Sequence, residues 1–209
     1  MDLLLKYFPH LTEAQKEVFL GLYDVYHYWN RRINIISRKD FHNFYLHHVL
    51  HSMAIARIIR FVPGTVILDV GTGGGFPGIP LAILFPDVHI LLLDSVRKKL
   101  KVIEAIAQEF NLDNITTRHD RIEQYNEKFD FVASRAVTRF PRFVNWVKDN
   151  IRSGHKNELV NGILYLKGGD VTSEIQDFRD KIRIYPIYNF YEEEFFQTKK
   201  ILYLPFELQ

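Results

Sequence analysis

The segment Val66-Ile-Leu-Asp-Val-Gly-Thr-Gly-Gly-Gly-Phe-Pro-Gly78 is an apolar run that ends in a cluster of glycines. This order is typical of a buried β-strand that turns sharply into a helix, because glycine adopts positive φ angles and lets a ligand approach the backbone. A second apolar run, Leu91-Leu-Leu-Asp94, ends in an acid about twenty residues further on, where a βαβ unit places a carboxylate for ribose hydroxyls. Together the two segments predict a site for a cofactor that contains a nucleoside.

Two kinds of cofactor compete for this loop. The residues Gly73 to Gly78 satisfy the dinucleotide pattern G-x-G-x-x-G, but in that pattern the first glycine directly follows the strand, and here that position is Gly71. A dinucleotide needs backbone N–H groups that converge on a pyrophosphate. S-adenosylmethionine has no phosphate and carries an ammonium group, which Asp69, two residues before Gly71, would complement. The pattern therefore favours S-adenosylmethionine over a nicotinamide.

Composition sets the broad class. The chain has 209 residues, 47% of them hydrophobic, which suits one large domain or a domain with a modest extension. It contains no cysteine, which excludes disulfides and thiolate chemistry. Its first residues do not resemble a secretory signal and no apolar stretch approaches a membrane span, so we expect a cytoplasmic protein with no membrane partner.

Charge is unevenly distributed along the chain. The net charge is only +2, yet residues 97–152 hold twelve Lys or Arg against eight Asp or Glu. A basic middle of this kind allows a polyanionic partner without proving one.

Hydrophobic periodicity divides the chain in two. We expect residues 1–62 to form a helical extension, with a capping box at Thr12 opening one helix and a second helix over residues 40–61. Residues 63–209 alternate between strands and helices, which predicts an α/β, doubly wound, mostly parallel seven-stranded sheet with an antiparallel strand at its end. The expected strands cover 65–70, 89–94, 114–119, 129–134 and 162–167, with β-rich runs over 183–191 and 199–206, and the expected helices cover 77–85, 96–110, 139–151 and 171–181.

A wider set of motifs extends well beyond the glycine loop. These motifs occur in order over roughly residues 10–170: Y-W-N-R-R-I-N-I-I from Tyr28, H-V-L-H-S from His48, G-G-G-F-P-G-I-P from Gly73, L-D-S from Leu93 with Lys98 and Lys99, S-R-A from Ser134 and L-K-G from Leu166. Together they resemble the bacterial glucose-inhibited division protein B family. The resemblance implies a Rossmann-like class I methyltransferase that makes N7-methylguanosine in the 530 loop of 16S rRNA.

The resemblance also implies roles for individual residues. The implied cofactor contacts are, beside Asp69, the loop residues Gly71, Gly73 and Phe76, the ribose-binding Asp94, Ile122 and Glu123 around the adenine, and Arg135. One position departs from the family, because His51 stands where an Asp is usual between the His and Ser of that helix. Any role that the family gives to the carboxylate of that Asp is therefore left open for this chain.

The implied reaction needs no catalytic acid or base. Guanine N7 has an in-plane lone pair and no proton, so in-line alignment with the methyl carbon and sulfur is the main requirement. The guanine gains positive charge during transfer. We therefore expect Arg135 to bind a phosphate or the methionine carboxylate rather than to assist the chemistry.

The RNA contacts are expected at the carboxyl edge of the sheet, and the candidates are Lys98, Lys99, Arg135, Arg139 and Lys167. The histidines at 47, 48 and 51 lack H-E-x-x-H and a third ligand, so we expect no metal. We expect a monomer that acts on 16S rRNA or the small ribosomal subunit. A methyltransferase acting on a small molecule or another RNA is the alternative.

Overall fold

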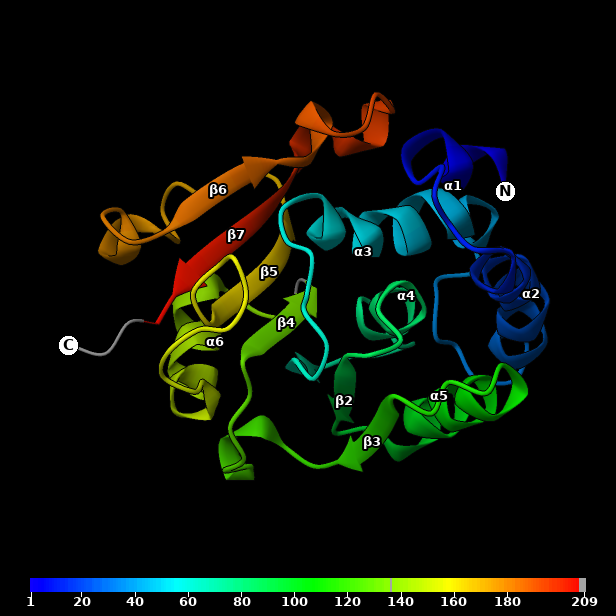
Figure 1. The fold of residues 1–209 in the computed structure, drawn as a ribbon, viewed down its shortest axis with the longest axis horizontal. Helices are drawn as coiled ribbons and strands as arrows, with labels where there is room; N and C mark the ends of the chain where they lie inside the picture. The colour runs from blue at the N-terminus through cyan, green and yellow to red at the C-terminus, as the bar shows by residue number, and fades with distance from the viewer. Residues whose placement is uncertain (136, 207–209) are drawn as a thin grey trace.

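Seven strands form one sheet in the computed structural model, which describes residues 1–135 and 137–206 (Figure 1). They are β1 (Val66–Val70), β2 (His89–Asp94), β3 (Ile115–His119), β4 (Phe131–Arg135), β5 (Gly162–Gly168), β6 (Arg183–Pro186) and β7 (Lys199–Pro205). The strand order is β3-β2-β1-β4-β5-β7-β6. Strands β1 to β5 run parallel, and β7 runs antiparallel to β5 and β6. The predicted fold class is confirmed.

Successive residues of the central strands face two different helical layers. In β1, Ile67 belongs to one apolar core, whereas Leu68 and Val70 belong to the other. The first core contains α4 (Gly78–Leu84) and α5 (Arg97–Glu109), and the second contains α6 (Phe140–Val147). Because helices cover both faces, the strands read as continuous apolar runs. Ligands of such a sheet bind beyond the carboxyl ends of the parallel strands.

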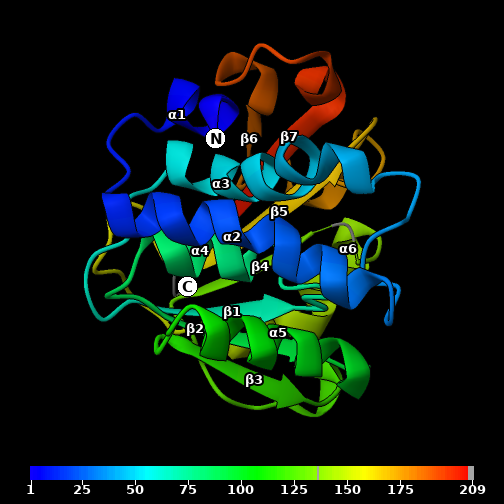
Figure 2. The same ribbon diagram turned by 90° about the vertical axis from the view of Figure 1, so that its right-hand side faces the viewer.

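The N-terminal helices form a further layer, in which α2 (Glu13–Asn30) lies over α4 and α5 (Figure 2) and α1 (Asp2–Tyr7) contacts the segment Phe44–Leu50. Helix α2 begins with the predicted capping box between Thr12 and Gln15. The Gln15 amide also donates to the Ile83 carbonyl of α4 at 2.9 Å. Phe19, Leu22 and Tyr26 of α2 are fully buried in the same core as α4. The N-terminal layer therefore packs directly on the helix that follows the glycine loop.

The helix expected over residues 40–61 is interrupted. The structure has a 3-10 turn at Phe41–Asn43, a π-helix at Phe44–Leu50, α3 (His51–Met53) and a second 3-10 turn at Ala54–Arg57. The wider π turn lets the consecutive side chains His47 and His48 reach one carboxylate, that of Asp40. Consecutive side chains of a regular α-helix point about 100° apart, so this convergence requires a local departure from that helix.

The helix expected over residues 171–181 is absent from the described structure, which has turns and one 3-10 turn at Gln176–Phe178. The spacing of Val171, Ile175 and Phe178 is helical, but polar side chains bond the backbone instead. Asp170 accepts hydrogen bonds from the N–H and hydroxyl of Thr172, and such bonds compete with helix formation. The β-rich run over 183–191 is a strand only as far as Pro186 and continues as a 3-10 turn.

Asn30, the last residue of α2, fixes the loop that follows. Its Oδ1 accepts hydrogen bonds from the N–H groups of Ile35 and Ile36 at 2.8 and 2.9 Å, and its Nδ2 donates to the Ile36 carbonyl at 2.9 Å. The side chain is buried. Three backbone groups of the loop therefore depend on one amide.

Replacing Asn30 should destabilise the fold. In Asn30→Ala, buried backbone groups lose their partner, and we expect a loss of about 2–3 kcal/mol in the free energy of unfolding, measured by urea denaturation. Asn34→Ala is the matched control, because Asn34 is an exposed asparagine of the same loop. Equal effects of the two substitutions would contradict the anchoring role.

Candidate active site

The loop after β1 has the backbone geometry that its glycines predict. Gly71, Gly73 and Gly75 have φ angles of +63°, +59° and +92°, which side chains other than glycine rarely adopt. Gly74 is required for a different reason, since a Cβ there would lie 2.1 Å from the Ile35 Cγ2 atom. The loop is therefore shaped from within by backbone conformation and from outside by the segment that Asn30 anchors.

Asp94, at the end of β2, bonds the glycine loop. Its Oδ2 accepts from the Gly73 N–H and its Oδ1 accepts from the Val96 N–H, both at 2.8 Å. Each carboxylate oxygen has a second lone pair. These lone pairs suit the ribose hydroxyls that the sequence predicts at this position.

A cavity of about 450 Å³ lies at the carboxyl ends of β1, β2 and β4, a size typical of ligand sites. It brings together five predicted cofactor residues, Gly71, Asp94, Ile122, Glu123 and Arg135, and two predicted RNA residues, Lys99 and again Arg135. Its other lining residues are Val70, Leu93, Ser95, Val96, Asp120, Arg121, Val137 and Trp146. Among these, Asp120 follows β3 directly, so its position after a strand end could have identified it as a lining residue from the sequence. Trp146 comes from the far end of α6 and has no such signal.

The cavity suits the chemistry of S-adenosylmethionine. Gly73 is not among the residues that line it, and its contact with the cofactor stays a prediction, but a Cβ on Gly73 would meet no atom closer than the Gly71 carbonyl at 3.9 Å, so the loop leaves open space beside it. Asp94 offers acceptors for ribose, and the buried Ile122 offers an apolar surface for a base. When bound, S-adenosylmethionine supplies an electrophilic methyl group.

Asp69 is buried beneath the loop and does not line this cavity. Its Oδ2 accepts from the Thr72 hydroxyl at 2.6 Å and from the Gly78 N–H at 2.8 Å. Burial raises the pKa of this carboxyl to about 7, although both hydrogen bonds lower it. Asp69 thus ties β1 to the first turn of α4, and its contact with the cofactor ammonium stays a prediction.

Phe76 also lies outside the cavity lining. Its ring is buried in the N-terminal layer, with ring centroids 5.2 Å from Tyr26 and 5.4 Å from His48. It contributes the contact between the loop and that layer. The predicted contact of Phe76 with the cofactor is not part of this arrangement and stays a prediction.

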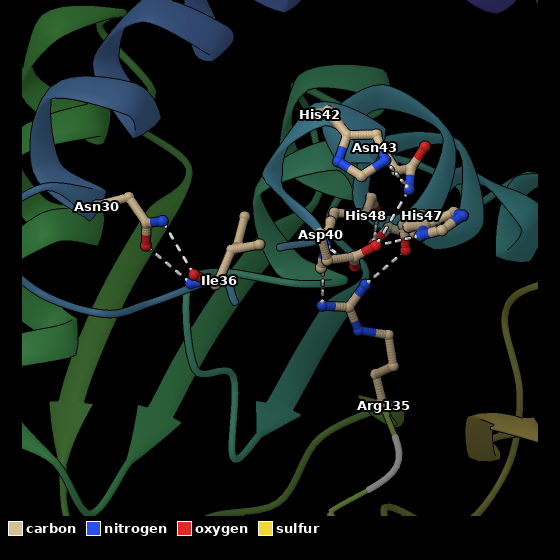
Figure 3. A network of polar contacts seen from close by, with 9 residues as sticks. Asn30, Ile36, Asp40, His42, Asn43, His47, His48 and Arg135 are labelled. Carbon is tan, nitrogen blue, oxygen red and sulfur yellow. Dashed lines mark hydrogen bonds and ion pairs between the residues drawn. The ribbon is translucent and has the colours of Figure 1, made fainter. Parts of the chain in front are cut away.

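Arg135 links the end of β4 to the π-helix (Figure 3). Its guanidinium donates to the His47 carbonyl and to Nδ1 of His48, both at 3.1 Å. His48 Nε2 lies 3.0 Å from Asp40 Oδ2, and His47 Nδ1 lies 2.6 Å from Asp40 Oδ1. Since His48 accepts at Nδ1, it must carry its proton at Nε2 and be neutral.

Burial and the Arg135 guanidinium lower the pKa of His48 to about 4. Burial also lowers the pKa of Arg135 to about 10, which leaves it charged at neutral pH. Two of its five N–H donors are needed for the two bonds above, so others remain for a ligand in the cavity.

His51, the departure from the family pattern, lies next to this network, and the positive charge of Arg135 acts on it together with burial. It is buried against the edge of Phe195, and its Nε2 has no hydrogen-bond partner in the described structure. Burial keeps its pKa well below the usual value. Among the described residues, no group of three or more His, Asp or Glu is placed to hold a metal ion.

The predicted RNA residues have different surroundings. Lys98 and Arg139 are exposed, and Lys99 is half-buried at the cavity. Lys167 is engaged within the fold, since it lies 3.0 Å from the Glu174 carboxylate and donates to the Thr138 carbonyl at 3.2 Å. RNA binding by these residues stays a prediction.

The His48 network predicts a pH dependence. The folded-state pKa is below the unfolded value, so His48 binds a proton on unfolding between about pH 6.5 and 4, and stability is lost as the pH falls through this window. The free energy of unfolding is measured by urea denaturation at about pH 7.5 and about pH 5. Between these two values, we expect the parent chain to lose about 1–2 kcal/mol more of this free energy than the His48→Gln variant. Parallel losses in the two proteins would show that His48 does not titrate in this way.

Replacing Asp94 should weaken cofactor binding. We expect Asp94→Ala to raise the dissociation constant of S-adenosylhomocysteine by at least about tenfold, because the carboxylate bonds the loop and is predicted to bond the ribose. Binding can be followed by the fluorescence of Trp146 in a Trp29→Phe background, since these are the two tryptophans of the chain.

Asp87→Ala is the control, because Asp87 is an exposed acid just before β2, at the opposite end from Asp94. Asp94→Asn tests whether the fold survives loss of the charge. Unchanged affinity in a folded Asp94 variant would refute the assignment.

Comparison with solved structures places the fold among methyltransferases. A SAM-dependent O-methyltransferase from Thermotoga maritima superposes with a TM-score of 0.57 at 14% identity, covering 88% of this chain and 71% of that one. A precorrin-6y C5,15-methyltransferase from Geobacter metallireducens has a TM-score of 0.55 at 12% identity, covering 84% and 92%. These likenesses show the class I methyltransferase fold alone.

Sequence comparison is more specific. The chain is 50% identical over 209 residues to the ribosomal RNA small subunit methyltransferase G of Flavobacterium johnsoniae, covering all of both chains. It is 52% identical over 204 residues to that of Phocaeicola vulgatus, covering 98% of each. The family model described as rRNA small subunit methyltransferase G matches residues 15–195. The chain belongs to this family of methyltransferases.

Proposed function

We propose that this chain transfers the methyl group of S-adenosylmethionine to N7 of a guanine in the 530 loop of 16S rRNA. The observation that carries the proposal is the cavity at the carboxyl edge of the sheet, which five of the predicted cofactor residues line, in a chain that matches rRNA small subunit methyltransferases from end to end. The family resemblance supplies the N7 position and the 530 loop.

Different residues of the site bind different parts of the cofactor. Asp94 holds the ribose, and the segment from Asp120 to Glu123 with Val137 surrounds the adenine. The open space beside Gly73 then receives the methionine end. Arg135, with free N–H donors and a positive charge, binds the methionine carboxylate or an RNA phosphate.

Guanine N7 suits a site of this kind because no proton leaves during methyl transfer. The protein needs to hold N7, the methyl carbon and the sulfur in line, and such alignment can supply roughly 7–11 kcal/mol. The reaction therefore requires no general base. The Asp94 carboxylate takes part in binding and not in proton transfer.

The proposal extends to the organisation of the enzyme. Residues 63–209 carry the methyltransferase site, and residues 1–62 form the helical extension that packs on it. The enzyme works as a monomer, without a metal ion, in the cytoplasm. No helix among the described residues is long and apolar enough to cross a membrane.

The test is methyl transfer from labelled S-adenosylmethionine to 16S rRNA that lacks the modification, offered as deproteinised RNA and as 30S subunits. We expect label in N7-methylguanosine from the 530 loop, activity that persists with a metal chelator, and little activity in Asp94→Ala. A matched RNA with 7-deazaguanosine at the target position has no N7 atom and should stay unlabelled.

Label in another nucleoside would contradict the proposed target. Cofactor binding without label in either RNA form would instead favour a different acceptor, such as a small molecule.

A further inference from the structure

The C-terminal end of α2 and the loop after it carry cations that the cofactor cavity does not use. The segment Arg31-Arg-Ile-Asn-Ile-Ile-Ser-Arg-Lys39 contains four cations and no acid. Arg31, Arg32, Arg38 and Lys39 are all exposed. Resting on the proposed function, we propose that these four residues, the Arg31–Lys39 surface, bind the phosphates of the substrate RNA beside the methyl-transfer site.

The position of this surface follows from the contacts of its own loop. Ile35 lies against Gly74, and the Tyr26 hydroxyl, one turn before the end of α2, donates to the Gly74 carbonyl. In Figure 2 the end of α2 and the loop lie on the side to which the arrowheads of β1 and β3 point. The surface therefore borders the glycine loop at the edge of the sheet that holds the cofactor cavity.

The cations of this surface are available to a ligand. Across residues 1–135 and 137–206, the side chains of Arg31, Arg38 and Lys39 make no hydrogen bond or ion pair. Other cations of the chain are neutralised internally, as Lys167 is by Glu174. The nearest acid on the loop, Asp40, is bonded to His47 and His48, and these bonds help to hold its pKa low. Unpaired positive charges that gather at one edge of the protein attract a polyanion.

An aromatic platform adjoins the cations. Tyr28 is 53% exposed, and the Arg32 guanidinium lies 3.7 Å from its ring centroid while donating to the Tyr28 carbonyl. Arg31 lines two adjacent hollows, one shared with Tyr28 and one shared with Arg38 and His42. Asp24 is the acid among the lining residues. Unpaired RNA bases stack on aromatic rings and on arginine planes, so this platform suits a splayed loop better than a duplex.

The experiment measures binding of a 530-loop RNA hairpin by fluorescence anisotropy at several salt concentrations. In the triple variant Arg31→Gln, Arg38→Gln, Lys39→Gln we expect affinity to fall by at least about tenfold, and the slope of log K against log salt to become shallower by about two to three. The affinity for S-adenosylhomocysteine should not change, because none of the three lines the cofactor cavity.

The control removes the same charge elsewhere. Lys148→Gln, Arg179→Gln, Lys181→Gln takes three exposed cations from the region around α6 and β6, and we expect affinity close to that of the parent chain. Tyr28→Ala should weaken binding several-fold at every salt concentration, because stacking is less sensitive to salt than phosphate contacts are.

The outcomes separate this inference from the proposed function. If the parent chain methylates 16S rRNA and the Arg31–Lys39 variant binds and methylates the RNA equally well, the surface is wrongly assigned and the function stands. If both triple variants lose the same affinity, the attraction is a general effect of charge and the inference fails. If the parent chain neither binds nor methylates the RNA, the function and the inference both fail.

Discussion

The site depends on a glycine loop with several positive φ angles that is held from two sides. From the sheet, Asp94 accepts the Gly73 N–H and Asp69 accepts the Gly78 N–H. From the N-terminal layer, the Tyr26 hydroxyl bonds the Gly74 carbonyl and Ile35 packs against Gly74. A loop with several positive φ angles has many alternatives in the unfolded chain. Fixing it from both sides removes those alternatives and leaves a preformed surface for a cofactor.

This arrangement makes the N-terminal layer part of the site rather than an attachment to it. Asn30 orders the loop that carries Ile35, and Arg135 reaches from β4 to the π-helix through His47 and His48. The neutral His48 is the central member of this network, because it accepts from a cation and lies beside a carboxylate at once. The same elements that fix the glycine loop present the Arg31–Lys39 surface next to it. The proposed cofactor contacts and the proposed RNA contacts would therefore share one structural support.

Much of the fold follows from local sequence. The strands β1, β2, β4 and β5 are largely apolar runs, whereas the edge strand β3 is mostly polar. All five strands and the helices between them lie close to their predicted positions. The segments at 40–61 and 171–181 differ from the predicted helices, because polar contacts of their side chains, and not hydrophobic spacing, decide their backbone. His47 and His48 converge on Asp40, and Glu174 accepts the Phe140 N–H at 2.7 Å. Hydrophobic spacing contains no information about such partners.

The lining of the cavity was predictable where residues follow strand ends. Gly71, Asp94, Ile122, Glu123 and Arg135 were expected there and line one cavity. Asp69 and Phe76 are close in sequence but point into the protein, and this orientation depends on which face of the turn the N-terminal layer covers. Trp146 lines the cavity because of the way α6 packs on the sheet, and the spacing of residues in the sequence does not predict this.

The most direct test of the cofactor assignment is a crystal structure with S-adenosylhomocysteine. The account predicts ribose hydroxyls within hydrogen-bond distance of Asp94, the adenine against Ile122 and the methionine end beside Gly73. A ligand bound elsewhere, for example in the hollow between α2 and α5 lined by Tyr28 and Gln108, would contradict it.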